Sequence, residues 1–315
     1  MVTASAIQAG LLHRFSKRLV AFEFANSSGQ PFKNLLLWVG GLSDGLSTCA
    51  YPQLLAKKVP PGWSLAQVEL LSSLDGWGTS SLQADVKGIS DAVSYFRKII
   101  PRGKIVLMGH STGCQDGMEY TVGKGRDDRS RIDGVILQAP VSDREAIIKD
   151  NSKEKIDSLL KTSKKWIDEG RGLDVLPAAI ADPLFGSSKC YVTAYRAHSL
   201  MASGGDDDYF SSDLPDSTLK RTFGIMKKET PLLILISGDD EHMAASIDKQ
   251  ALGDRWSQFV KAGGGAVDEE NGCIVPGAHH TLNEDNDQTF QELRKRVVSF
   301  LGKVEKGQFA PGSQL

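Results

Sequence analysis

Residues 104–120 read KIVLMGHSTGCQDGMEY, and this stretch decides the fold. An apolar run meets GHSTG at residues 109–113, and a helix-compatible segment follows. This is the sequence form of a nucleophile elbow, in which a serine lies on a tight turn between a strand and a helix. Such a turn brings backbone segments together, so a Cβ at Gly109 or Gly113 would collide with its neighbours. The motif therefore predicts Ser111 as a nucleophile.

A second match to the same motif, GLSDG at residues 41–45, also follows an apolar run. The residues after each motif separate the two. Gly117 would let a helix after Ser111 pack closely on a sheet, whereas Pro52 predicts an irregular connection after the second motif. We therefore favour Ser111 over Ser43 as the nucleophile.

A serine hydroxyl needs a base that removes its proton, and suitable residues follow in chain order. A buried-strand pattern at 231–236 leads into SGDDE at 237–241, and a second strand pattern leads into GAHH at 277–280. An acid just past a strand end can reach across the carboxyl edge of a parallel sheet. The order serine, acid, histidine is that of the α/β-hydrolases.

Both partners of the serine have neighbours of the same type. The acid is Asp239, Asp240 or Glu241, and the base is His279 or His280. Their positions within the two loops favour Asp240 and His280. The doubled residues leave each register open by one position.

An oxyanion hole needs two backbone N–H groups close to the nucleophile. One comes from the residue after the serine, here Thr112, and the other from the loop after an earlier strand. The glycine-rich turn at 40–45 suits the second role, with the Leu42 N–H as the predicted donor. Ser43 and Asp44 would then line the site.

The composition is that of an ordinary soluble globular protein: 315 residues, of which 40% are apolar and 24% charged. This length suits one large α/β domain with an insertion. A net charge of −2 and a pI near 6.3 argue against a nucleic-acid or anionic-membrane partner. The four cysteines form no CxxC pair, which predicts a reducing compartment and no metal site. No run approaches the ~18 apolar residues of a membrane span.

The chain ends offer weak targeting signals. The basic residues Arg14, Lys17 and Arg18 resemble part of a transit peptide, but the alternation at 19–24 predicts a first pair of strands. The apolar core of a signal peptide is absent. The final SQL is a poor variant of the peroxisomal address, and 307–315 is predicted to be a frayed tail. We expect a cytoplasmic protein, with a peroxisomal location as the alternative.

Strand-like runs alternate with helix-like runs, which predicts a mostly parallel central sheet flanked by helices. The predicted strands lie at 35–39, 66–70, 105–108, 134–138, 232–236 and 272–275, and the predicted helices include 81–100 and 287–301.

The interval between Gln138 and Leu232 is too long for a normal crossover. It predicts an insertion that covers the carboxyl edge of the sheet as a lid and carries substrate specificity. The expected organisation is a hydrolase core at 1–140 and 231–302, a lid at 141–230 and a flexible tail at 303–315.

The acidic stretch DDDYFSSD at 206–213 does not have the spacing of an EF-hand loop. Asp and Ser side chains in such clusters usually cap helices or close turns. We expect this stretch to shape the lid, with Arg196 as an internal charge partner, and we expect no metal there.

Several longer stretches are more specific than the serine motif. They are Ser72-Ser73 with Gly76-Trp77-Gly78 and Ser81-Leu82, then GHSTGCQD at 109–116, GGDDDYFSSDL at 204–214 and SGDDE at 237–241. On these motifs the chain, from about residue 11 to 301, resembles a fungal α/β-hydrolase family that includes the fusarinine-type siderophore esterases. The resemblance implies hydrolysis of ester bonds in hydroxamate siderophores such as fusarinine C and its triacetyl form, with release of iron inside the cell. By position it implies a triad of Ser111, Asp240 and His280.

The resulting hypothesis is a serine esterase that acts on a small-molecule ester, such as a ferric siderophore, and needs no cofactor. Two alternatives stay open. One is a carboxylesterase, lipase or acyltransferase with another substrate, although the charged segment at 143–169 has little of the apolar face expected of a lipase lid. The other is a non-catalytic binding protein of the same fold, which would have no need of serine, acid and histidine together.

Overall fold

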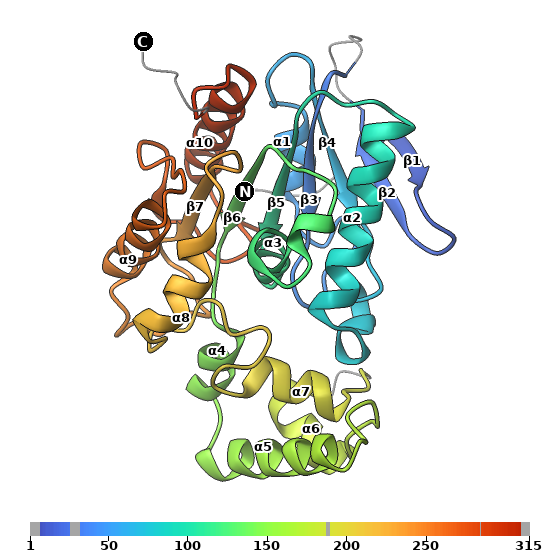
Figure 1. Ribbon diagram of the computed structural model, residues 1–315, viewed down its shortest axis with the longest axis vertical. Coiled ribbons are helices and arrows are strands. Elements are labelled where there is room, and N and C mark those ends of the chain that lie inside the picture. Colours follow the sequence, from blue (N-terminus) through green and yellow to red (C-terminus); the bar gives the residue numbers. More distant parts are fainter. Residues whose placement is uncertain (1–6, 26–31, 187–189, 284, 310–315) are drawn as a thin grey trace.

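Eight strands form one sheet in the computed structural model, which describes residues 7–25, 32–186, 190–283 and 285–309 (Figure 1). The strand order is β1-β2-β4-β3-β5-β6-β7-β8. Strands β3 to β8 pair in parallel, whereas β2 pairs antiparallel with both β1 and β4. The strands are β1 (Gly10–Arg14), β2 (Val20–Phe24), β3 (Asn34–Val39), β4 (Trp63–Val68), β5 (Ile105–His110), β6 (Gly134–Gln138), β7 (Leu232–Ser237) and β8 (Cys273–Val275).

Helices follow most of the strands, as a parallel sheet requires. The α-helices are α1 (Tyr51–Ala56), α2 (Leu82–Lys98), α3 (Gly113–Val122), α4 (Asp143–Lys149), α5 (Lys153–Asp168), α6 (Ala178–Phe185), α7 (Ala194–Met201), α8 (Asp216–Arg221), α9 (Lys249–Ala262) and α10 (Asp287–Glu305). Three 3₁₀ helices are η1 (Leu74–Thr79), η2 (Arg126–Asp128) and η3 (Phe223–Ile225). Among the described helices, none is both long and apolar enough to cross a membrane.

The sheet is buried on both faces because its strands alternate between two cores. In β3, Leu35 and Leu37 belong to the core that α2, α3 and α9 cover, while Leu36 and Trp38 belong to the core that α1 and α10 cover. A central strand covered on both sides reads as a continuous apolar run, which is what the sequence presents here. The predicted mostly parallel sheet flanked by helices is confirmed.

The sequence predicts that the segment at 19–24 belongs to a first pair of strands. In the structure β2 occupies Val20–Phe24 and pairs antiparallel with β1. The strand predicted at 66–70 lies earlier, at Trp63–Val68. It begins after Gly62, whose φ of +83° ends the preceding turn, and it stops before Leu70, whose carbonyl accepts the Ser73 N–H in a new turn (3.2 Å).

Two helical regions differ from the sequence interpretation. Helix α1 occupies the stretch predicted to be irregular, because Pro52 lies in the first turn, where its missing N–H leaves no hydrogen bond unmade. Helix α9 was not predicted. Helix α10 continues to Glu305, past the predicted core boundary at 302, and residues 310–315 of the predicted tail lie outside the described residues.

Helices α4 to α7 form a separate layer, called the cap here, which lies below the sheet in Figure 1. The cap has its own apolar cluster, to which Ile156, Leu159 and Leu200 belong, together with Trp77 of η1. The later part of the interval at 141–230 packs elsewhere: Phe223 stacks on Trp256 of α9, with ring centroids 5.7 Å apart. The boundaries of the lid stay a prediction.

Candidate active site

Ser111 lies in the turn between β5 and α3 with a φ of +53°, a conformation that non-glycine residues rarely adopt. Its N–H donates to the Gln138 carbonyl (3.1 Å). A Cβ on Gly109 would lie 2.0 Å from the Gly113 oxygen, and one on Gly113 would lie 2.5 Å from the Val39 oxygen. Glycine is therefore required on both sides of the serine, and the strained turn projects Ser111 from the carboxyl edge of the sheet.

His280 joins Ser111 to Asp240. Its Nε2 lies 2.7 Å from the Ser111 Oγ, and its Nδ1 lies 2.8 Å from the Asp240 Oδ2. The Asp240 carboxylate is fully buried, and its other oxygen accepts the His242 N–H (3.0 Å). The strand ends of β5 and β7 and the loop after β8 thus bring these three side chains into one hydrogen-bonded line.

The neighbouring candidates point elsewhere. The His279 side chain is 57% exposed, and its Nδ1 lies 2.6 Å from the Asp285 Oδ1. Asp239 is exposed. Glu241 has a contact that the sequence did not suggest: its carboxylate accepts the backbone N–H of His280 (2.9 Å). Of the predicted acids and bases, the structure brings Asp240 and His280 to Ser111, and their catalytic role stays a prediction.

The electrostatics of Asp240 suit a partner for an imidazole. Burial raises the pKa of this carboxyl, but the hydrogen bond from His280 and the charge of that ring, with the His242 N–H, outweigh it and hold the pKa below its usual value. Asp240 therefore stays ionised at neutral pH. An ionised carboxylate at this place holds the imidazole tautomer and stabilises its protonated form.

The glycine-rich turn after β3 touches the nucleophile. A Cβ on Gly41 would lie 2.5 Å from the Ser111 Cβ, so only glycine fits. The Asp44 carboxylate closes the turn by accepting the Gly41 N–H (2.7 Å), and the Asp44 N–H donates to the Gly41 oxygen (3.1 Å). Ser43 is exposed with a φ of +66° and has no contact with His280 among the described interactions.

The two predicted oxyanion donors lie on the segments that meet at this contact. Leu42 follows Gly41 directly, and Thr112 follows Ser111 and precedes the first residue of α3. The Leu42 side chain packs against the apolar cluster of the cap. The close approach of Gly41 to Ser111 brings these two segments together, and the use of the two N–H groups as donors stays a prediction.

Gln138, at the end of β6, supports the site and was missed from the sequence. Its Oε1 accepts the Tyr51 hydroxyl (2.9 Å) and lies 2.6 Å from the His110 Nδ1. Its Nε2 donates to the Ser237 Oγ (3.4 Å) and to the His280 oxygen (3.5 Å). One polar residue at the end of the apolar strand GVILQ was the available signal.

Asp44, Cys49 and His110 have possible metal-ligating atoms within 4.8 Å of one another, which makes them the candidate metal cluster among the described residues. Each of these three side chains already has a partner within the protein. The Cys49 thiol contacts Asp44 (3.8 Å), and burial raises the pKa of that thiol, so the thiolate form that binds metals is disfavoured. Burial and the nearby His280 lower the pKa of His110 to about 4, so its ring is neutral. These contacts account for the cluster without a metal.

Arg196 is the internal charge partner of the acidic stretch, as expected. Only 1% of Arg196 is exposed, and its Nη1 donates to both carboxylate oxygens of Asp207 (2.8 and 2.7 Å). Its Nε donates to the Trp77 oxygen (3.1 Å). Arg196 therefore ties α7 of the cap to η1 of the core through Trp77.

The remaining residues of the acidic stretch also have structural partners. The Asp208 carboxylate lies 3.4 Å from the Arg144 Nε and accepts the Gly204 N–H (2.9 Å). The Tyr209 hydroxyl donates to the Glu119 carboxylate of α3 (2.7 Å). This stretch shapes the junction between cap and core, in agreement with the sequence interpretation.

A second set of acids lies around Arg196 and reaches the nucleophile turn. Burial, with the charge of Asp207, raises the pKa of Asp143 to about 7. Burial raises the pKa of Asp85 to about 6 and that of Asp116 well above its usual value. Asp143 accepts hydrogen bonds from the Thr112 hydroxyl (3.2 Å) and from Gln115 (2.7 Å).

Comparison with known sequences identifies relatives along nearly the whole chain. A family model described as "Protein of unknown function (DUF1749)" matches residues 2–302. The UPF0613 protein PB24D3.06c of Schizosaccharomyces pombe is 39% identical over 94% of this chain and 98% of its own length. Fusarinine C esterase sidJ of Aspergillus fumigatus is 33% identical over 94% of this chain and 96% of its own length.

Solved structures with a similar fold cover nearly the whole chain as well. Siderophore hydrolase EstB from Aspergillus fumigatus superposes with a TM-score of 0.80 at 32% identity, covering 96% of this chain and 99% of its own. A protein described as an alpha/beta hydrolase fold protein of unknown function has a TM-score of 0.62 at 18% identity, covering 98% of this chain and 99% of its own, which bears on the fold alone. The predicted α/β-hydrolase fold is confirmed.

Proposed function

This chain belongs to the DUF1749 family, and on that premise we propose that it is a serine esterase that cleaves ester bonds of hydroxamate siderophores of the fusarinine C type. The substrate class rests on two similar fungal proteins, one named as a fusarinine C esterase and one as a siderophore hydrolase. The chemistry rests on one observation: the unbroken contacts from Ser111 through His280 to Asp240.

In the first half of the reaction, the Ser111 Oγ attacks the ester carbonyl while the His280 Nε2 takes its proton. The negative charge on the carbonyl oxygen is held by the backbone N–H groups of Thr112 and Leu42, each contributing about 3 kcal/mol. Collapse of the tetrahedral intermediate breaks the ester bond, and the leaving alcohol takes the proton from His280. The acyl group remains on Ser111.

In the second half, a water molecule gives a proton to His280 and attacks the acyl-serine. The carboxylic acid leaves, and the Ser111 hydroxyl recovers its proton. Asp240 acts through His280 in both halves: it fixes the tautomer that presents a free Nε2 and stabilises the imidazolium. Over both halves the reaction consumes one water molecule and the ester, and it yields the alcohol and the carboxylic acid.

The cap is proposed to select the substrate. Leu42, which carries a proposed oxyanion donor, packs against the cap cluster, and Arg196, paired with Asp207, ties the cap to Trp77 of η1. A cap fixed in this way can hold the remote parts of a bulky trihydroxamate while one ester reaches Ser111. Hydrolysis would weaken the chelate and free its iron; a cytoplasmic location is part of this proposal.

Product analysis tests the function directly. Purified protein is incubated with fusarinine C and triacetylfusarinine C, each in ferric and iron-free form, and hydrolysis products are identified by mass spectrometry. We expect linear fragments with wild type and none with Ser111→Ala. If the wild-type protein cleaves a small activated ester but leaves all four siderophore forms intact, the chain is an esterase with another substrate. If it cleaves neither class, a non-catalytic binding role is favoured.

A further inference from the structure

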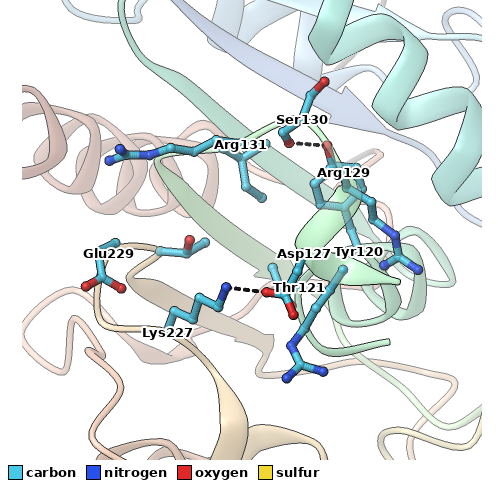
Figure 2. A pocket seen from close by; sticks show the side chains of 11 residues that line it. Tyr120, Thr121, Asp127, Arg129, Ser130, Arg131, Lys227 and Glu229 are labelled. Atoms are coloured by element: carbon cyan, nitrogen blue, oxygen red, sulfur yellow. Dashed lines mark hydrogen bonds and ion pairs between the residues drawn. The ribbon is translucent and has the colours of Figure 1, made fainter. Parts of the chain in front are cut away.

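A cavity of about 340 Å³ lies at the amino edge of the sheet, opposite the edge that carries Ser111. Figure 2 shows the side chains that line it. Its walls are the end of α3, helix η2, and the segments that lead into β6 and β7. Those strands begin at Gly134 and Leu232, whereas Ser111 follows the end of β5. The cavity is therefore separate from the proposed active site, although α3 runs from one to the other.

Basic side chains predominate in this cavity, which is called the basic cavity here. The charged lining residues are Arg126, Arg129, Arg131 and Lys227, with Asp127 and Glu229 as the acids. Lys227 is neutralised by Asp127, at 2.5 Å. An adjoining cavity of about 190 Å³ shares Arg131 and Glu229 and adds Lys104, Lys228 and the acid Asp133 to the lining, with Lys104 paired to Asp133 at 3.3 Å. The local excess of positive charge occurs in a chain whose net charge is −2.

Two arginines of the basic cavity have N–H donors with no acceptor, or only a distant one, among the described residues. The Arg126 Nε is buried without a hydrogen-bond partner, and its Nη1 reaches the Val122 oxygen only at 3.5 Å. The nearest carboxylate to Arg131 is Asp133 at 3.7 Å, and the Arg131 side chain is 69% exposed. Among the described residues Arg126 has no carboxylate within 4.0 Å and Arg131 has none closer than 3.7 Å, so an anion from outside the chain can pair with their guanidinium groups.

Arg129 gives the basic cavity a fixed wall. Its Nη2 donates to the Lys124 oxygen (2.7 Å) and to the Glu119 carboxylate (3.2 Å), and its guanidinium lies 5.8 Å from the Tyr120 ring centroid. A side chain held by so many contacts loses little freedom when a ligand binds. Arg129, whose charge is offset by Glu119, thus shapes the wall and is not a free donor.

We propose that the basic cavity binds a compact polyanion bearing phosphate or carboxylate groups, with Arg126 and Arg131 as its hydrogen-bond donors. The planar fork of a guanidinium matches the paired oxygens of both groups. A volume of about 340 Å³ is within the range of small-molecule sites and suits an anion of the size of pyrophosphate or citrate. This site is independent of the esterase proposal.

Isothermal titration of the full chain with pyrophosphate, and separately with citrate, tests the site. We expect saturable one-site binding of at least one of them, weakened at least about tenfold in Arg126→Gln and in Arg131→Gln. Arg171→Gln is the matched control, since Arg171 is an arginine of the cap region paired with Asp174. It should change the affinity less than about twofold.

Arg131→Glu supplies a second variant at an exposed position that the fold does not depend on, and it should abolish binding. Each variant is checked for wild-type melting and for activity on a small activated ester, so a loss of binding is separated from a loss of fold. Binding of pyrophosphate alone assigns a phosphate ligand, and binding of citrate alone a carboxylate ligand. Absence of saturable binding of both up to about 10 mM, or equal affinity in wild type and Arg131→Glu, overturns the proposal.

Discussion

Two groups of carboxylates flank Ser111, and burial affects them in opposite ways. Asp240 lies in the loop after β7, and its pKa is lowered although it is buried. Asp143 lies where the cap meets the core, and its pKa is raised to about 7. The difference is the partner. The Asp240 carboxylate is hydrogen-bonded to the His280 ring, whereas Asp143 forms no ion pair among the described residues, and the Arg196 Nη1 is taken by Asp207. Burial leaves a carboxylate charged only where a dedicated partner offsets it.

The contrast places charge where the proposed chemistry needs it. An ionised Asp240 stabilises the imidazolium that forms on His280. Asp143 accepts the Thr112 hydroxyl, beside the residue whose N–H is a proposed oxyanion donor. A neutral acid there does not repel a developing oxyanion, while a charged one would. We therefore expect the two groups to differ sharply when each is altered.

The largest effect on catalytic activity is expected from removing the Ser111 hydroxyl, which both groups of carboxylates flank. Ser111→Ala should lower kcat/KM for an activated ester on the order of 10⁴-fold or more, because the members of such a unit act together. Ser43→Ala, in the second GxSxG match, should keep near-wild-type activity. Steady-state kinetics with circular dichroism as the folding check measure both. Loss of activity in Ser43→Ala, with Ser111→Ala still active, would contradict the assignment.

The adjacent histidines should differ almost as much. His280→Ala removes the contact with Ser111 and should match the loss in Ser111→Ala, since the base and the nucleophile form one unit. His279→Ala removes an exposed side chain paired with Asp285 and should cost less than about tenfold. Kinetics of the two single variants decide the question. The reverse ranking would move the base to His279.

The two carboxylate groups are compared directly by Asp240→Asn and Asp143→Asn. Asp240→Asn removes a charge that is present and should reduce kcat about 10³- to 10⁴-fold. Asp143→Asn replaces a largely protonated group and should leave kcat within about tenfold of wild type at pH 6. Both are measured on the same activated ester. Equal losses would mean that the two groups share one electrostatic role.

The smallest expected effect is on stability. The folded pKa of Asp143, about 7, exceeds the unfolded value of about 3.9, so between those values the folded protein holds more protons. Wild-type stability should therefore fall as pH rises from about 4 to 7, and Asp143→Asn should lack this part of the fall. We expect the melting temperature of the variant relative to wild type to increase from pH 5 to pH 8.

Asp91→Asn is the control for that measurement, because Asp91 is a substantially exposed acid paired with Lys87. Its melting temperature relative to wild type should not rise between pH 5 and pH 8. Asp85, whose pKa is raised to about 6, should leave a residual slope of the same sign in Asp143→Asn. If the melting temperature of Asp143→Asn minus that of wild type instead falls from pH 5 to pH 8, Asp143 is charged in the folded protein and the prediction is wrong.

Local sequence carried the prediction of the nucleophile turn. Gly109 and Gly113 leave no room for a Cβ, and this requirement belongs to a turn a few residues long. The apolar strands and the long interval before β7 likewise predicted the sheet and an insertion. Arg196 was also identified as a charge partner, because a stretch rich in aspartate follows it closely in the chain. These inferences needed only chain order and residue type.

Tertiary structure alone decided which member of each doubled pair faces Ser111. His279 and His280 differ by one position in a loop, and the direction of a loop side chain depends on the contacts of its backbone, such as the His280 N–H on Glu241. Tertiary structure also decided three further features: the support of the site by Gln138, the raised pKa of Asp143 and the basic cavity. Burial and the distance between charges arise from segments far apart in the chain, so residue type and spacing determine which groups are available, and only the folded arrangement determines their partners and their protons.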